Sequence, residues 1–366
     1  MGFQCGIVGL PNVGKSTIFN ALTSNKADAS NFPFCTIEPN LGIVNVPDTR
    51  LDQIAKFIPP QKLIPTTMVF VDIAGLVAGA SKGEGLGNKF LGHIRETDAI
   101  AHVVRCFEDD NIVHVDGSVD PIRDIEVIEL ELIFADQASV EKRLITLQKK
   151  ARSGDKDTIK TVAALEKVLP KLEEGIPARA IKLSDEDLLS IRDLHLITLK
   201  PSLFVANVDE ADLVDPSQNA HFQKVAEFAA AQGSQVVAIC GSIEAELAEM
   251  EAEDKLEFLA DLGVKEPGLN QVIRAGYKLL NLHTYFTAGE KEVRAWTFHD
   301  GYKAPQAAGV IHTDFERGFI KADVYHYDDL VKFESEQAVK EAGQMRLEGK
   351  SYVVKDGDIM HFRFSV

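Results

Sequence analysis

The chain has 366 residues, 45% of them hydrophobic and 26% charged, which is enough to build two or three domains with separate cores. Its formal net charge of −17 at pH 7 excludes a protein that coats nucleic acid with its whole surface, although a local basic site remains compatible with it. No apolar run reaches the about 18–20 residues that a membrane-spanning helix needs.

Five apolar segments of strand length alternate with helical patterns along the chain. They cover residues 3–9, 67–72, 99–106, 202–207 and 235–240. Strands that alternate with helices predict a parallel sheet covered by helices on both faces. The first strand leads straight into a functional loop, without the basic segment or cleavage site of a secretory signal, and the four cysteines show no metal-binding spacing. We therefore expect free, buried thiols and a cytoplasmic location.

The residues after the first strand form a phosphate-binding motif. Gly9-Leu-Pro-Asn-Val-Gly14-Lys15-Ser16 matches the pattern G-x-x-x-x-G-K-[ST] in full and precedes a helix, as this motif requires. Its backbone N–H groups cradle phosphates, and the N-terminus of the helix adds a positive dipole end. Lys15 is expected to reach the β- and γ-phosphates as a catalytic residue, and the Ser16 hydroxyl to coordinate Mg²⁺. The predicted nucleotide-binding residues here are Asn12, Val13, Gly14, Lys15, Ser16 and Thr17.

Two further elements stand where nucleotide switches place their triphosphate sensors. Asp72 ends the second strand and begins the motif Asp72-Ile-Ala-Gly75. Its carboxylate is expected to hold Mg²⁺, and the Gly75 N–H is expected to sense the γ-phosphate as part of the catalytic machinery. Upstream, Thr36 of the loop 31–36 is expected to complete the metal shell when a triphosphate is bound. In this class of protein the γ-phosphate and Mg²⁺ hold such loops, which are released on hydrolysis.

The group that positions the attacking water is not evident in its usual place. The D-x-x-G motif is followed by Leu76, which has no polar atom, where Ras-type enzymes carry a glutamine. Hydrolysis is therefore expected to be slow until a partner supplies a group, unless another side chain reaches in. His114, in the loop 108–120, is our catalytic candidate, and an ordinary loop histidine is the alternative. Neither Arg95 nor Arg105 can be assigned as an internal arginine finger.

A long insertion separates the third and fourth strands. Residues 123–150 and 156–174 carry apolar side chains at helical spacing, with a break at Ser153-Gly154-Asp155. This pattern predicts an antiparallel helical hairpin inserted into the nucleotide domain. Residues 141–160 hold seven basic and three acidic side chains, which fits either a solvated helix face or a contact for RNA phosphates. A further helix is expected to start after Ser184.

The fourth strand ends in a variant of the motif that reads the base. Guanine-specific proteins carry N-K-x-D here, whereas this chain has Asn207-Val208-Asp209-Glu210. Val208 replaces the lysine that packs along the base, and the longer carboxylate of Glu210 would crowd the edge of guanine, so ATP is favoured over GTP. Asn207, Val208 and Glu210 are the predicted base-binding residues. A shifted register that lets Asp209 read guanine is the alternative. After the fifth strand, Cys240-Gly241-Ser242 is expected to contribute backbone contacts only.

The character of the sequence changes from about residue 281. Short aromatic and β-branched segments follow one another there, and residues 328–347 have a partly helical pattern. The short segments are residues 283–290, 292–298, 319–327 and 358–366. Together these patterns predict a compact α+β C-terminal domain with a mixed sheet.

These motifs together resemble a known family. The glycine-rich stretch from Asp72 to Asp98, with residues 31–40 before it, resembles the Obg branch of GTPases. Its combination with the N-x-x-E motif, the helical insert and the C-terminal domain resembles the YchF family of Obg-like ATPases, over essentially the whole chain. The resemblance implies an α/β P-loop NTPase G domain (1–125 and 198–280), a helical coiled-coil insert (126–197) and an α+β TGS domain of β-grasp shape (281–366).

The resemblance also implies that ATP is accepted at least as well as GTP and that the protein associates with ribosomes, the large subunit being the expected partner. RNA contacts through the basic insert and the TGS domain are a further expectation. The leading hypothesis is therefore an ATPase that acts as a nucleotide-dependent switch. Two alternatives stay open: a strict GTPase with an atypical base motif, and a nucleotide-gated binding protein in which hydrolysis is incidental. A nucleoside kinase is disfavoured because its lid arginines are not evident.

Overall fold

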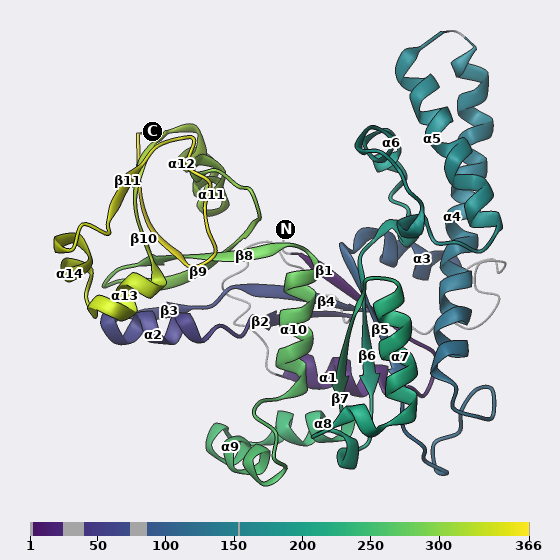
Figure 1. The fold of residues 1–366 in the computed structure, drawn as a ribbon, viewed down its shortest axis with the longest axis horizontal. Coiled ribbons are helices and arrows are strands. Elements are labelled where there is room, and N and C mark those ends of the chain that lie inside the picture. The colour runs from purple at the N-terminus through teal and green to yellow at the C-terminus, as the bar shows by residue number, and fades with distance from the viewer. Residues whose placement is uncertain (1–2, 25–39, 74–85, 153, 366) are drawn as a thin grey trace. The chain divides into compact units, whose positions relative to one another are not determined.

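The computed structural model in Figure 1 describes residues 3–24, 40–73, 86–152 and 154–365. Thr36, Gly75, Leu76 and Ser153, all named above, therefore lie outside the described residues. The chain divides into two compact units. Unit 1 consists of Met1–Val44 and Val69–Gly276, and unit 2 consists of Asn45–Met68 and Tyr277–Val366.

Unit 1 is built on a six-stranded sheet with the order β2-β4-β1-β5-β6-β7. Its strands are β1 (Gln4–Val8), β2 (Leu41–Asn45), β4 (Thr67–Asp72), β5 (Ala99–Arg105), β6 (Ser202–Asn207) and β7 (Gln235–Ile239). In this spatial order, the five neighbouring strands β4, β1, β5, β6 and β7 are joined by parallel pairings. This confirms the predicted parallel sheet and all five predicted strands. β2 was not predicted. Every residue of β6 is buried, as expected for a strand covered on both faces.

Outside the inserted hairpin, the longer helices of this unit are α1 (Lys15–Ser24), α3 (Leu86–Glu96), α7 (Ala220–Ala231), α8 (Gly241–Glu249), α9 (Ala252–Asp261) and α10 (Gly268–Leu279). Of these, α1, α3 and α7 contact strands of the sheet, and α9 packs with α8. Side chains from β5, β6, α7 and the start of α4 (Pro121–Ala151) form one core cluster, which includes Val104, Phe204, Ile125 and Val225. Short 3-10 helices cover Ala178–Ala180, Arg192–Leu194, Ile197–Leu199, Glu210–Asp212 and Pro216–Gln218.

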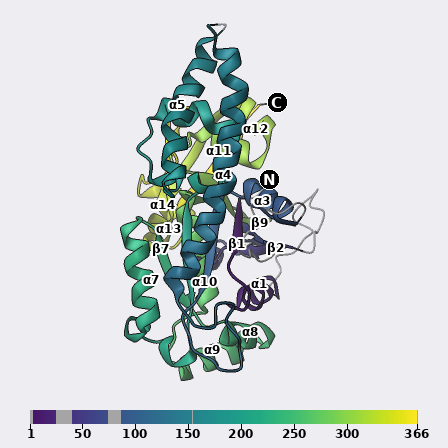
Figure 2. The same cartoon turned by 90° about the vertical axis from the view of Figure 1, so that its right-hand side faces the viewer.

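The inserted hairpin consists of α4 (Pro121–Ala151) and α5 (Lys156–Glu173), which lie side by side in Figures 1 and 2. The two helices end and begin on either side of the predicted break, and buried side chains such as Val140 and Leu165 fill the space between them. The predicted start after Ser184 is also confirmed, because Ser184 caps α6 (Asp185–Ile191) with a capping box. α4 crosses the predicted domain boundary at residue 126 without interruption, since its first turns belong to the core of the sheet.

Unit 2 contains a second six-stranded sheet, in the order β11-β10-β12-β8-β9-β3. The pairs β8–β12 and β3–β9 are parallel and the others are antiparallel, so the predicted mixed sheet is confirmed. The strands are β3 (Lys62–Ile64), β8 (Leu282–Ala288), β9 (Glu292–His299), β10 (Phe319–His326), β11 (Arg346–Glu348) and β12 (Asp358–Phe364). The helices are α2 (Thr49–Phe57), α11 (Ala304–Ile311), α12 (Thr313–Arg317), α13 (Tyr327–Phe333) and α14 (Glu336–Glu341).

One segment departs from the predicted domain boundaries. Residues 45–68 were expected within the nucleotide domain, but α2 and β3 belong to unit 2. Leu51 and Ile54 of α2 pack into its core with Phe286, and β3 pairs with β9. The Arg50 guanidinium forms ion pairs with two carboxylates. Its Nη2 lies 2.8 Å from Asp48 Oδ2, and its Nη1 lies 2.7 Å from Asp356 Oδ2. The physical reason is that this segment buries its apolar side chains against strands more than two hundred residues away, which local spacing does not reveal.

The predicted free thiols are confirmed where the structure describes them. Cys5, Cys106 and Cys240 are buried and unpaired by disulfides, while Cys35 lies outside the described residues. Among the described helices, none combines the length and the apolar character needed to cross a membrane.

A buried carboxyl group links two helices of unit 1. Glu244 of α8 is 2% exposed, and its Oε1 accepts a hydrogen bond of 2.6 Å from the backbone N–H of Gly268, the first residue of α10. Burial raises the pKa of Glu244 to about 7 from an ordinary value of 4.5, although backbone N–H groups oppose the shift. The folded protein therefore binds this proton more tightly than the unfolded chain does.

Stability should consequently fall as the pH rises from 4.5 through about 7, because ionised Glu244 is disfavoured in the fold. The full effect is on the order of 3 kcal/mol. Glu244→Gln keeps an oxygen acceptor for Gly268 and carries no charge, so it should be more stable than the unaltered chain at pH 8 and similar to it at pH 5. Urea unfolding at both pH values tests this. Glu246→Gln, on the exposed side of α8, should leave the pH dependence unchanged.

Candidate nucleotide-binding site

The predicted phosphate loop lies between β1 and α1, where the chain leaves the carboxyl end of a central strand and enters a helix. Asn12 and Gly14 have φ values of 63° and 92°, in the left-handed region, and this backbone shape makes the loop concave. A Cβ atom on Gly14 would collide with the Asn207 amide nitrogen. Glycine is therefore required at this position for two independent reasons. The side chains of Ser16 and Thr17, at the start of α1, are exposed.

Lys15 and Asp72 meet at this loop. β1 pairs with β4 in the register Ile7↔Asp72, which brings the end of β4 beside the phosphate loop. Lys15 is 8% exposed, and its ammonium group forms an ion pair with the Asp72 carboxylate. The structure thus places together the two charged side chains that were predicted to bind phosphate and metal.

The oxygen atoms near this ion pair suit a magnesium ion. A hydroxyl from Ser16 and a carboxylate from Asp72 are hard donors, and Mg²⁺ is bound in proteins through such oxygens together with the phosphates of a nucleotide. The described part of the predicted set therefore fits Mg²⁺. Thr36, the third predicted ligand, lies outside the described residues.

Asn207 connects three loops of the site. Its Nδ2 donates to the Val13 carbonyl at 3.0 Å, and its Oδ1 accepts from the Gly241 N–H at 2.9 Å. The residue is 4% exposed. In this conformation the amide supports the phosphate loop and the loop after β7, which is a role that the base-motif pattern alone did not predict.

The other two predicted base-binding residues have different environments. Val208 is 1% exposed and packs with Phe204 and Val225 in the core, and its part in base binding stays a prediction. A valine that continues the buried pattern of β6 is drawn into the core by its apolar surface. Glu210 is exposed at the start of a 3-10 helix, where its carboxylate is free to approach a ligand from the solvent side.

Arg105 anchors the loop that carries His114. This arginine is 1% exposed, and its guanidinium donates to the carbonyls of Phe107, Asp109 and Ile112 at 3.0, 3.2 and 2.8 Å. Arg95 is also engaged elsewhere, since its Nη2 donates to Ser139 of α4 at 2.7 Å. Neither arginine is directed at the phosphate loop in this conformation.

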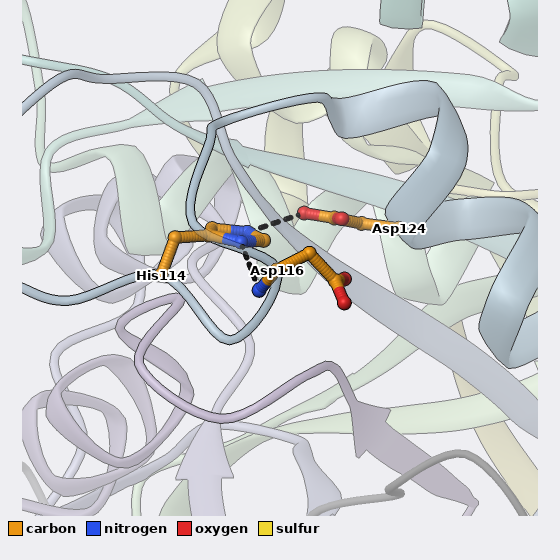
Figure 3. A group of neighbouring side chains, drawn as sticks. All are labelled: His114, Asp116 and Asp124. Carbon is orange, nitrogen blue, oxygen red and sulfur yellow. Dashed lines mark hydrogen bonds and ion pairs between the residues drawn. The ribbon is translucent and has the colours of Figure 1, made fainter.

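The same loop contacts the phosphate loop directly. Asn12 Nδ2 donates to the Val113 carbonyl at 3.1 Å, which places the neighbouring His114 close to the predicted nucleotide site. His114 is the one buried residue between positions 107 and 120, a stretch that the structure describes in full. Figure 3 shows its ring held between Asp124 and the backbone of Asp116. The structure thus buries the predicted catalytic candidate, and its role in positioning water stays a prediction.

His114, Asp116 and Asp124 offer three potential metal-ligand atoms within 4.8 Å of one another. However, Arg123 already supplies positive charge to this cluster. Its Nη2 lies 3.0 Å from Asp124 Oδ1, and its Nε lies 3.6 Å from Asp116 Oδ2. We therefore assign no metal to this cluster.

Sequence reasoning missed three structural features of this region. They are the anchoring role of Arg105, the contact of Asn12 with the His114 loop and the partnership of His114 with Asp124. For the anchoring role of Arg105, the only indication in the sequence was that a charged residue ends an otherwise apolar strand. The other two depend on how a loop folds back, which no residue pattern indicated.

Comparison with known proteins gives matches along the whole chain. A family model described as "50S ribosome-binding GTPase" matches residues 4–150, and the YchF-GTPase_C model, described as a protein of unknown function, matches residues 282–365. Proteins named "Ribosome-binding ATPase YchF" are 59% identical in Haemophilus ducreyi and 55% identical in Bacillus subtilis, over 100% of both chains. The solved YchF GTPase of Schizosaccharomyces pombe is 40% identical, with a TM-score of 0.86 over 99% of this chain and 98% of that chain.

Proposed function

The chain belongs to the YchF family, and from this we propose that it is a magnesium-dependent P-loop ATPase that acts as a nucleotide-dependent switch on the ribosome. The observation that carries the catalytic half is the convergence of Lys15, Asp72 and Asn207 on one concave loop. The ribosomal half is supported by the names of the relatives. Such a protein works in the cytoplasm.

Each residue of the site would have a distinct role in binding the nucleotide and Mg²⁺. Lys15 binds the β- and γ-phosphate oxygens with its ammonium group, and the backbone N–H groups of residues 13–17 surround the phosphates. Ser16 and Asp72, completed by Thr36, would hold Mg²⁺, which neutralises charge on the phosphates when it is bound. The Gly75 N–H would sense the γ-phosphate. Asn207 keeps the phosphate loop in shape through Val13.

Slow hydrolysis is part of this proposal. Leu76 offers no polar atom to the attacking water, and His114 is the residue of the chain that we propose to orient it. His114 lies one residue from Val113, which the phosphate-loop residue Asn12 contacts. In the described conformation the ring is engaged on both sides, so a rearrangement of the loop must precede hydrolysis.

Preference for ATP over GTP rests on Glu210. Its exposed carboxylate stands at the motif position where aspartate reads guanine, one methylene longer than that reader. We expect calorimetry with Mg²⁺ to give a lower Kd for ATP than for GTP. Glu210→Asp should restore the shorter reader and reduce the ATP preference by about tenfold.

Two controls distinguish the alternatives for base recognition. Glu210→Gln removes the charge but keeps the length, so it should not improve GTP binding. If the register is shifted, Asp209→Asn will weaken GTP binding and the Glu210 variants will not. Binding of GTP by the unaltered chain about tenfold tighter than binding of ATP would contradict the assignment.

We further propose that the large ribosomal subunit is the partner and that the hairpin tip contacts its RNA. The family model for residues 4–150 carries a 50S description, which supports the subunit. Within the basic stretch, Arg143 and Lys160 are paired with Asp193 and Glu186. Basic side chains that are exposed around the end of the hairpin are Lys142, Lys149, Arg152 and Lys156. Exposed cations of this kind suit phosphate contacts.

The domain limits that we propose are those of the family, a G domain (1–125 and 198–280), a coiled-coil insert (126–197) and a TGS domain (281–366); residues 45–68 of the first range pack in unit 2. A nucleotide-gated binding protein remains the second candidate function. The observation that favours it is the engagement of both His114 ring nitrogens, because a protein in which hydrolysis is incidental needs no accessible catalytic group.

A further inference from the structure

The imidazole ring of His114 is held by two partners of opposite hydrogen-bonding character. Its Nε2 lies 2.8 Å from Asp124 Oδ2, and its Nδ1 lies 3.2 Å from the backbone nitrogen of Asp116. Both members of the His114–Asp124 pair are buried, with side chains 4% and 3% exposed. Figure 3 shows these three residues and the two contacts. Water is thus largely kept from this pair.

These contacts determine where the ring proton must lie. A backbone N–H can only donate, so Nδ1 must present its lone pair to Asp116. A carboxylate accepts, so Nε2 must carry the proton that it donates to Asp124. The other carboxylate oxygen of Asp124 is also committed, because it accepts from Arg123 Nη2 at 3.0 Å and from Nε at 3.3 Å.

We propose that Asp124 is the positioning residue for His114, which it holds as the tautomer protonated on Nε2. Nδ1 is then the only ring atom that can accept a hydrogen bond from the attacking water. This inference rests on the proposed role of His114 in hydrolysis. Asp124 does not touch the nucleotide and acts only through the orientation and protonation of the ring.

In the described conformation the Asp116 N–H donates to Nδ1, the ring atom that would have to accept a hydrogen bond from the attacking water. For Nδ1 to accept from water, the short segment after His114 must release it, while the bond from Nε2 to Asp124 keeps the ring oriented. The release requires little free energy, because a neutral hydrogen bond that is exchanged for one with water contributes little net stability. Asp124 lies in the first turn of α4, whose first residue is Pro121, and does not have to move with the loop.

Asp124→Asn tests the proposal because Arg123 decides how the new amide is oriented. The two guanidinium donors require an oxygen, so the amide NH₂ turns toward His114. A donor facing Nε2 takes the lone pair of that atom and places the ring proton on Nδ1, which breaks the 3.2 Å hydrogen bond from the Asp116 N–H. We expect ATP turnover to fall by about 100-fold, while the Kd for ATP from calorimetry stays within about twofold.

The tautomer itself can be measured without any reaction. In ¹⁵N spectra of the unaltered protein at neutral pH, His114 should show a protonated Nε2 and an unprotonated Nδ1, assigned by comparison with His114→Ala. In Asp124→Asn the two signals should exchange character. A wild-type ring protonated on Nδ1 would overturn the inference, and this result does not depend on whether Asp124→Asn folds well.

Matched variants separate the possible failures. Asp120→Asn removes a charge at the N-cap of the same helix, and asparagine caps helices as well as aspartate does, so turnover and tautomer should not change. If His114→Ala leaves turnover unchanged, the proposed role of His114 fails. If His114→Ala lowers turnover but Asp124→Asn preserves both turnover and tautomer, the positioning role of Asp124 is wrong and the role of His114 stands.

Discussion

Replacing Lys15 with alanine should lower ATP turnover by at least about 100-fold. The ammonium group is the single basic side chain that the structure brings to Asp72 beside the phosphate loop, within the described residues. Its removal leaves the developing charge on the γ-phosphate without its cationic partner, and it leaves Asp72 without its ion pair. Turnover should be measured as phosphate release with Mg·ATP in excess, and ATP affinity by calorimetry.

Lys224→Ala is the matched control, because Lys224 is an exposed lysine on α7 of the same unit. It should retain full turnover. Circular dichroism must show that both variants are folded. Turnover by a folded Lys15→Ala chain at the rate of the control would refute the assignment of this loop as the hydrolytic site.

The same variant also separates the switch from the binding-protein hypothesis. Lys15→Ala should lose nucleotide-dependent co-sedimentation with ribosomes, because it cannot hold the triphosphate. His114→Ala should bind ATP but hydrolyse it more slowly. If His114→Ala still sediments with ribosomes and is not released over time, turnover drives release. Identical binding and release by His114→Ala and the unaltered chain would show that hydrolysis is incidental.

Arg105→Met should destabilise unit 1 by roughly 3 kcal/mol and should also reduce ATP turnover. Methionine fills much of the same space but donates no hydrogen bonds. Three carbonyls at Phe107, Asp109 and Ile112 would lose their buried donor, and the ring of Phe107 would lose the guanidinium that lies 4.6 Å from its centre. The loop that presents Val113 to Asn12 would then no longer be fixed.

Urea unfolding gives the stability change, and phosphate release gives the effect on turnover. Arg152→Met, at the exposed end of α4, is the control and should stay within about 0.5 kcal/mol of the unaltered chain. Unchanged stability of Arg105→Met would mean that the three carbonyls are readily satisfied by water, and that the loop does not need its anchor.

Much of the fold could be predicted because its determinants are local. The phosphate loop is recognisable from Gly9 to Ser16, since glycine, lysine and serine are each required at a fixed spacing. The parallel strands are uninterrupted apolar runs of the right length, and the hairpin is marked by its break near Gly154. The position of Asp72 beside the phosphate loop could be predicted because this residue ends one of these apolar runs.

The features that could not be predicted depend on contacts between distant residues. Residues 45–68 join unit 2 because Leu51 and Ile54 fit its core, which no property of the segment itself reveals. The core position of Val208 likewise depends on Phe204 and Val225, which the base motif itself does not indicate. The burial of His114 follows from Asp124, whose pairing with the ring requires a loop conformation that spacing does not specify.

One mechanical consequence follows from the length of α4. Thirty-one residues without a break form a stiff rod roughly 45 Å long, with Asp124 near one end and the hairpin tip at the other. A tilt of only about 5° at the base would sweep the tip through roughly 4 Å. A partner that binds the tip would therefore exert a force on the first turn of α4, where Asp124 contacts the His114 ring.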